Sequence, residues 1–93
     1  MKYFDWDEEK NAKLRHQREV SFEDVVSAIE DNRVLDRIDH HNVGRYPNQK
    51  IIIVSINDYA YLVPYVEDEE KIFFKTIIPS RKMTKKYIIE RRK

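Results

Sequence analysis

The sequence contains no cysteine and, among its 93 residues, only one glycine and three prolines. Without cysteine the chain has no disulfide bond, no thiolate zinc site and no cysteine nucleophile, which fits the reducing cytoplasm where we expect the protein. The scarcity of glycine and proline argues against long flexible linkers. No apolar run approaches the roughly 20 residues that cross a bilayer, and the chain opens with no apolar signal segment. We therefore expect a soluble protein, with no membrane partner, that forms a single domain over residues 1–93.

Charge is abundant, since 38% of the residues are Asp, Glu, Lys or Arg. The net charge of +1 conceals a strong polarity along the chain. Residues 1–70 hold 9 Lys and Arg against 16 Asp and Glu, a balance of −7, whereas residues 71–93 hold 9 against 1, a balance of +8. This pattern predicts a site for a polyanion, or for an acidic segment of a partner, at the basic end. A solvated terminal helix is the structural alternative.

The start of the chain predicts a short strand followed by a helix. Residues 2–6 are typical of a strand, and the helix after them is expected to run to about residue 17. Asp5 or Asp7 can cap this helix, and Asp5 with Glu8 has the spacing of a capping box. The sequence leaves the choice between these two caps open.

Residues 21–32 predict a second helix more clearly. Ser21 and Asp24 form a capping-box pattern at its start. Four apolar side chains recur at the helical spacing i, i+3, i+4, i+7: Phe22, Val25, Val26 and Ile29. We expect this face of the helix to enter the core.

After residue 33 the apolar period changes from the helical value to two, which predicts strands. The expected strands are residues 34–38, 50–56, 59–67 and 71–78, separated by a loop at 39–49, a two-residue turn at Asn57-Asp58 and an acidic turn at 67–70. Pro64 predicts an edge position or a bulge in the third of these strands. A terminal helix is expected from Ser80 onward.

This order predicts an α+β fold: a short N-terminal strand, two helices, an antiparallel four-stranded meander and a C-terminal helix, with the helices packed on one face of the sheet. Three segments in this order, "YFDWDEEKNAKL", "SFEDVV" and "IIPSRKMTKKY", resemble the BrnT-type toxins of bacterial type II toxin–antitoxin systems, which are small ribonucleases of the RelE-like fold. The most specific shared residues are Trp6, Asp7, Lys10 and Asn11 in the first segment, and Pro79, Ser80, Arg81, Lys82 and Thr84 in the last.

The resemblance implies a metal-independent endoribonuclease toxin that uses no cofactor and cleaves RNA to inhibit translation. It also implies a cognate antitoxin that neutralises the toxin, usually a dimeric ribbon-helix-helix protein. The expected assemblies are a toxin–antitoxin hetero-oligomer or a dimer.

Three polar positions depart from the family's pattern. Members of the family commonly have Lys-His-Gly where this chain has Gln-Arg-Glu, at residues 17–19. The nearest histidine of this chain is His16. Thr76 stands where members often carry an arginine, and Tyr87 where they tend to have a glutamate. These departures keep two alternatives open: a toxin-fold binding module with weak or lost catalysis, and a toxin that acts on a protein target such as gyrase.

The corner before the last helix is the predicted anion site. The strand before it is expected to end at Ile78, because a proline follows. Ser80 is a good helix N-cap, which would leave the amides of Arg81, Lys82 and Met83 at the positive end of a helix. Such amides, together with a guanidinium, can bind phosphate. A capped helix with solvated cations is the alternative.

Metal-independent RNA cleavage needs a base for the 2′-hydroxyl, an acid for the leaving oxygen and a cation for the phosphate. Arg81 is predicted to supply the cation, with Lys82 or Lys75 in support. The candidates for acid and base are His40, His41, Tyr59 and Tyr61. The two histidines could equally be loop residues without a function, and a tyrosine would need its pKa lowered by nearby cations. The histidine pair lacks a third ligand, so no metal site is predicted.

The predicted RNA-binding residues are Ser80, Lys10, Lys75, Lys85 and Trp6. Trp6 could stack on a base with Lys10 one helical turn away, or it could pack the helix start on the sheet. Tyr59, Tyr61 and Tyr65 share one strand face and could likewise stack on bases, although such residues also form ordinary sheet cores.

Overall fold

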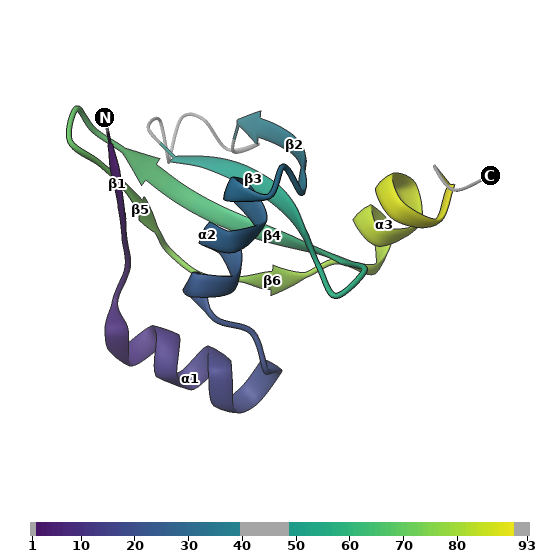
Figure 1. Ribbon diagram of the computed structural model, residues 1–93, viewed down its shortest axis with the longest axis horizontal. Coiled ribbons are helices and arrows are strands. Elements are labelled where there is room, and N and C mark those ends of the chain that lie inside the picture. Colours follow the sequence, from purple (N-terminus) through teal and green to yellow (C-terminus); the bar gives the residue numbers. More distant parts are fainter. Residues whose placement is uncertain (1, 40–48, 91–93) are drawn as a thin grey trace.

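A six-stranded sheet with helices around it forms the fold, which a computed structural model describes for residues 2–39 and 49–90 (Figure 1). The elements in chain order are β1 (Tyr3–Asp5), α1 (Glu8–Arg18), α2 (Phe22–Glu30), β2 (Val34–Asp39), β3 (Gln49–Ile56), β4 (Tyr59–Glu67), β5 (Lys71–Phe74), β6 (Ile78–Pro79), α3 (Arg81–Thr84) and a π-helical turn, η1 (Lys85–Ile89). The α+β class is confirmed. None of the helices in these ranges is long and apolar enough to cross a membrane.

The sheet has the strand order β1-β5-β4-β3-β2, and β6 also pairs with β4. Strands β2 to β5 form the predicted antiparallel meander, and β1 adds to β5 in parallel. Asn57 and Asp58 form the predicted turn between β3 and β4, with φ angles of 54° and 61°. Both residues tolerate this left-handed backbone, which matches the twist of a hairpin.

The strand expected at 71–78 is two strands, β5 and β6, separated by residues 75–77. The cause lies in Pro64 on the neighbouring strand β4. Pro64 accepts a hydrogen bond from the Lys75 amide at 2.8 Å, but it has no amide of its own to return one. The N–H and C=O of a strand residue point to the same neighbour, so the pairing is broken there. Of the two predicted alternatives the edge position is wrong, because Pro64 lies in an interior strand. The bulge is confirmed, because residues 75–77, between Phe74 and Ile78, face only the two residues of β4 at 63–64.

Helix α1 is capped by Asp7. Its Oδ1 accepts hydrogen bonds from the amides of Glu9 at 2.9 Å and Lys10 at 3.3 Å. Asp5 instead accepts from the amide of Trp6. The helix ends at Arg18, and the next residue, Glu19, has φ 57°.

Helix α2 begins with the predicted capping box. Ser21 Oγ accepts from the Asp24 amide at 3.2 Å, and the Ser21 amide donates to Asp24 Oδ2 at 2.9 Å. Phe22 and Val25 are fully buried, and the remaining two residues of the predicted apolar face are half-buried against the same core. The helical period therefore identified the core face of α2 correctly.

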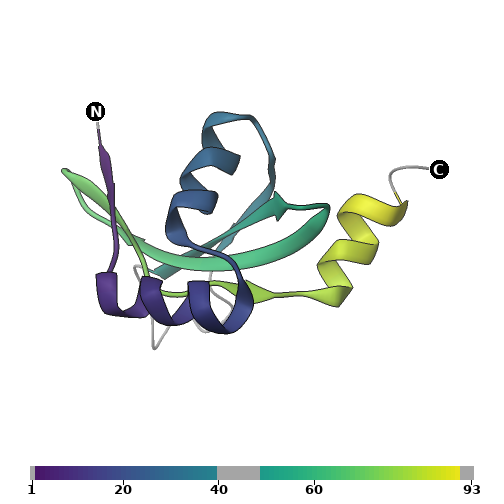
Figure 2. The same ribbon diagram turned by 60° about the horizontal axis from the view of Figure 1, so that its bottom comes forward.

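Two cores lie on opposite faces of the sheet, because successive strand residues point to opposite sides. Side chains from α1 and α2 pack on one face, with Ile52 and Val63. Ile88 of η1 packs on the other face, with Ile51 and Ala60. Figure 2 shows α2 rising from the curved sheet while the C-terminal helix lies at its far end. The expectation that all helices cover one face is thus wrong.

The motif that contains Trp6 and Asn11 connects α1 to the start of α2. The side chain of Asn11 is 2% exposed; its Oδ1 accepts from the Phe22 amide and its Nδ2 donates to Glu23 Oε1, both at 2.7 Å. The Trp6 ring stacks on the rings of Phe22 and Phe74. These residues therefore hold the two helices together, and the hydrogen bond from Asn11 is the main cause that lowers the pKa of Glu23.

Replacing Asn11 with alanine (Asn11→Ala) should lower the free energy of unfolding by about 1–3 kcal/mol, because the buried Phe22 amide loses its acceptor. The pKa of Glu23 should also rise toward its ordinary value. Urea denaturation measures the first effect and carboxyl NMR the second. Lys13→Ala on the exposed side of α1 is the control and should change neither quantity. Unchanged stability in Asn11→Ala would show that the hydrogen bond between Asn11 and the Phe22 amide does not stabilise the fold.

Glu19 adopts the left-handed conformation that glycine occupies without a steric cost. Glu19→Gly should therefore raise the free energy of unfolding by roughly 0.5–1 kcal/mol, measured by urea denaturation. The control Gln17→Gly, inside α1, should lower it by about the same amount. Equal effects of the two substitutions would show that the backbone at position 19 is not strained.

Candidate nucleic-acid interface

The corner between β6 and α3 is fixed to the hairpin of β4. The Ser80 amide donates to the Ala60 carbonyl at 3.0 Å, and the Ala60 amide donates to Thr84 Oγ1 at 2.8 Å. The Thr84 hydroxyl in turn donates to the Ser80 carbonyl at 2.8 Å. Ala60 and Thr84 are buried, so this network is shielded from water. The cationic side chains that follow Ser80 therefore start from a well-defined backbone.

The helix end itself is a weaker anion site than the sequence predicted. Ser80 Oγ accepts from the Met83 amide at 3.2 Å, so this amide is not available to a ligand. Helix α3 has only four residues before the π-helical turn begins. Because η1 continues α3 without a break, the peptide dipoles of both are aligned behind the corner. The exposed cationic side chains add to the attraction of this helix start for an anion.

Exposed cations surround this corner. Arg81, Lys82 and Lys85 are exposed, and within residues 2–39 and 49–90 their side chains make no hydrogen bond or ion pair. Lys86 lies over the Tyr87 ring, 5.2 Å from its centroid. The C-terminal helix has no acidic residue before Glu90. Positive charge is therefore concentrated along residues 81–86.

Arg18 brings a further cation from α1. Its Nη1 donates to the Ile77 carbonyl at 2.8 Å, just before β6. Sequence reasoning did not select Arg18, although it stands where the resembling family commonly has histidine. The next residue, Glu19, has a left-handed backbone and stands where the resembling family commonly has glycine. The only sequence signal for Arg18 was this departure from the pattern.

Tyr61 lies beside the corner, since it pairs with Pro79 between β4 and β6. Its ring meets the ring of Tyr59 edge-on at 5.6 Å. Burial and the nearby Tyr59 raise the pKa of Tyr61 above its ordinary value, and the charge of Arg18 opposes this only in part. The lowered pKa that the sequence analysis required of a catalytic tyrosine is therefore not found at Tyr61. A phenol that stays protonated at neutral pH can donate a proton or a hydrogen bond.

Several predicted contacts lie away from the corner. Lys10 precedes Arg18 by two turns of α1, about 12 Å along the axis. Lys75 lies over the Phe73 ring at 5.7 Å, and Phe73 pairs with Val66, on the face opposite Tyr61. The packing interpretations hold for two aromatic residues that the sequence left open: the Trp6 ring is stacked within the α1–α2 face, and Tyr65 is buried in the core there.

The remaining predicted residues are histidines and altered family positions. His40 and His41 lie outside the described residues, and His16 is exposed in the last turn of α1. No group of three or more His, Asp or Glu that could hold a metal occurs within the described ranges. Tyr87 donates to Asp36 Oδ2 at 2.5 Å, which raises the pKa of Tyr87 and ties η1 to β2.

A comparison with known families gives one match. The model of the family described as "Ribonuclease toxin, BrnT, of type II toxin-antitoxin system" matches residues 6–86, which include both resembling motifs. Neither the curated proteins nor the solved structures contain a match to the chain. The family match spans nearly the whole domain, from the Asp7 cap to the cationic corner. The chain therefore belongs to the BrnT family of ribonuclease toxins of type II toxin–antitoxin systems.

Proposed function

We propose that the protein is an endoribonuclease toxin that needs no metal ion, cleaves RNA in the cytoplasm and thereby inhibits translation. A cognate antitoxin, of the ribbon-helix-helix kind, neutralises it in a hetero-oligomer. The observation that carries the site assignment is the hydrogen bond from Arg18 to the Ile77 carbonyl. It brings a second guanidinium, from α1, to the corner where Arg81 begins the last helix. We infer that Arg18 and Arg81 bind one phosphodiester, whose two non-bridging oxygens can each accept hydrogen bonds.

In the proposed reaction the 2′-oxygen of a ribose attacks the adjacent phosphorus atom. A bond forms from phosphorus to this oxygen, and the bond to the 5′-oxygen of the next nucleotide breaks. The products are a 2′,3′-cyclic phosphate and a free 5′-hydroxyl. Arg81 and Arg18 stabilise the extra negative charge on the phosphate as attack proceeds.

Tyr61 supplies the proton that the leaving 5′-oxygen needs. The pKa of Tyr61 is raised by burial, so the phenol is protonated at neutral pH; it can donate a proton but is excluded as the resting-state base. His40 and His41 are our candidates for the base that accepts the 2′-hydroxyl proton. Ser80, Lys82 and Lys85 contact neighbouring phosphates of the RNA.

The distribution of charge would orient the RNA. Asp68 and the two glutamates after it are exposed in the turn between β4 and β5, at the end of the molecule away from α3 (Figure 1). The pKa of Asp68 is lowered because its carboxylate accepts hydrogen bonds from the amides of Lys71 and Glu70. The acidic turn would repel RNA, and the basic corner would attract it.

Arg81→Ala should lower the rate of RNA cleavage about 100- to 1,000-fold, because one cation of the charged phosphate is lost. Cleavage of a long RNA in EDTA, followed on a denaturing gel, is the measurement. Arg18→Ala should show a loss of similar kind, and Lys13→Ala, an exposed lysine on α1, should retain the wild-type rate. Cleavage by Arg81→Ala at the wild-type rate would contradict the assignment of Arg81 as the cation that stabilises the phosphate. Wild-type protein that binds RNA without cleaving it would identify a binding module instead.

Tyr61→Phe should lower cleavage roughly 100-fold or more, because the leaving oxygen loses its proton donor. Its affinity for a non-cleavable 2′-O-methyl RNA should stay the same, since the ring is kept. Loss of affinity with unchanged single-turnover cleavage would instead show a stacking role. Tyr59→Phe is the matched control.

The pKa of Tyr61, followed by the NMR signal of its ring carbon, should lie above that of a free tyrosine. Arg18→Gln should raise this pKa further, because the opposing positive charge is removed. A raised pKa favours the folded state below the unfolded pKa of about 10, so the free energy of unfolding should fall as pH rises beyond that value. A lowered pKa in wild-type protein would contradict the dominant effect of burial at Tyr61.

A further inference from the structure

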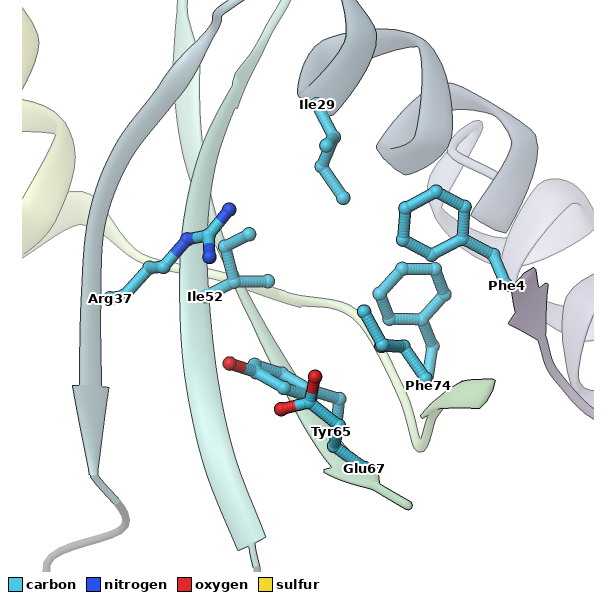
Figure 3. Close-up of a pocket in the computed structure, with 8 residues that line it drawn as sticks. Phe4, Ile29, Arg37, Ile52, Tyr65, Glu67 and Phe74 are labelled. Carbon is cyan, nitrogen blue, oxygen red and sulfur yellow. The ribbon is translucent and has the colours of Figure 1, made fainter. Parts of the chain in front are cut away.

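Three tyrosines lie along β4 on the sheet face that carries α1 and α2, and they are buried to different degrees. Tyr65 is 7% exposed and lines a small cavity together with Ile52 and Phe74 (Figure 3). Tyr61 is half-buried against the same core. Tyr59 is also half-buried, but its ring belongs to neither of the two core clusters that the described residues form. Core packing therefore does not account for an aromatic side chain at position 59.

The cavity beside Tyr65 is too small for a nucleobase. Its volume is about 70 Å³. A cavity of roughly 150 Å³ in another protein binds benzene, so a space half as large does not hold even one six-membered ring. An RNA base bound on this face of the sheet therefore needs an accessible ring at the surface.

The Tyr59 ring meets this requirement. Within residues 2–39 and 49–90 its single ring contact is with Tyr61, at 5.6 Å between the centroids and 61° between the planes. An edge-on contact of this kind covers at most one face of a ring. The second face of the Tyr59 ring is therefore not committed to an aromatic neighbour.

The backbone places Tyr59 beside the cationic corner. The Ser80 amide donates to the Ala60 carbonyl at 3.0 Å. Tyr59 precedes Ala60 and Arg81 follows Ser80, so these two residues are the next pair along the same antiparallel register. Helix α3 begins at Arg81, and Figure 1 shows the turn between β3 and β4 beside the start of this helix. The ring at position 59 thus starts from backbone adjacent to that of Arg81.

Arg18 approaches the same place from α1. The charge of Arg18 acts on the Tyr61 hydroxyl, and the Tyr61 ring contacts Tyr59. The carboxylate of Asp24 also acts on this hydroxyl, but Asp24 is engaged in the capping box of α2. A phosphate held by Arg18 and Arg81 would therefore have the Tyr59 ring next to it.

We propose that Tyr59 is a stacking platform for one unpaired base of the RNA, next to the phosphate that Arg18 and Arg81 bind. The inference rests on the proposed function and names its substrate class, which is single-stranded RNA. In an A-form duplex each base face is covered by its neighbours, so Tyr59 can stack only on a base that is splayed out. Stacking uses the face of the ring rather than charge, so the exposed Asp58, which precedes Tyr59, does not oppose it.

The test is binding of the full chain to a 2′-O-methyl pentanucleotide in which the fluorescent base 2-aminopurine stands between uridines. Uridine stacks weakly, so the purine should occupy the platform and define the register. Wild-type protein should quench the fluorescence. Tyr59→Leu should bind about tenfold more weakly and lose most of the quenching, because the ring is removed.

Two control variants keep this result specific. Tyr59→Phe retains the ring and should bind within about twofold of wild type. Tyr3→Leu removes an exposed tyrosine from β1, at the opposite edge of the sheet, and should likewise have less than about a twofold effect. Unchanged binding and quenching by Tyr59→Leu would overturn the proposal.

A pentanucleotide with an abasic centre separates stacking from a structural effect of the substitution. Wild-type protein should bind it about tenfold more weakly than the purine version. Tyr59→Leu should bind the two versions equally, because the base and the ring contribute to one interaction. Losses that multiply independently would overturn the proposal. A blunt-ended RNA duplex that competes as well as the single strand would also overturn it.

Failure of the inference and failure of the proposed nuclease can be told apart. The 2′-O-methyl pentanucleotide is not cleaved, so the expected binding results with no cleavage of a long RNA would contradict the catalytic assignment alone. Cleavage by wild-type protein, together with wild-type binding by Tyr59→Leu, would contradict the stacking role alone. Wild-type protein that binds the pentanucleotide without quenching would overturn the stacking role as well.

Discussion

Ala60 uses both of its backbone polar groups to hold the beginning of the C-terminal helix. Its carbonyl accepts from Ser80, and its amide donates to the hydroxyl of Thr84. A buried amide without a partner would cost about 1–3 kcal/mol, so the helix start is strongly held against β4. The position of Arg81 on one side and the packing of Ile88 on the other follow from this attachment.

The same attachment explains why the candidate site forms where two layers meet. The C-terminal helix packs near the start of β4 on one face of the sheet, and α1 packs on the other face. Arg18, at the last position of α1, reaches the carbonyl of Ile77 between them. The opening family motif contributes indirectly, since Asn11 and Trp6 set how α1 lies against α2 and the sheet.

Features with a local cause could be predicted from the sequence. The capping box of Ser21 and Asp24 and the left-handed turn at Asn57 depend on residues within one or two positions of each other, and both are present. The break after Phe74 depends on Pro64, a residue of the neighbouring strand. Residues 71–78 alone do not specify this break, although the polar residues Lys75 and Thr76 lie within it.

The candidate site was predictable in part. The basic composition of the corner was visible, and the family model matches the region that contains it. Arg18 was not selected, because its hydrogen-bond partner is 59 residues away. The direction of the pKa change at Tyr61 was also missed. Nearby cations can be inferred from the sequence, but the burial that outweighs them is a property of the folded sheet.

The interruption between β5 and β6 does not extend to β4, which runs unbroken from Tyr59 beside the cationic corner to Glu67 at the acidic turn. At about 3.3 Å per strand residue, the two ends of this strand lie about 26 Å apart. Exposed charges of opposite sign at that separation are largely screened from each other at physiological ionic strength. The basic end can therefore attract a polyanion although the net charge of the chain is only +1.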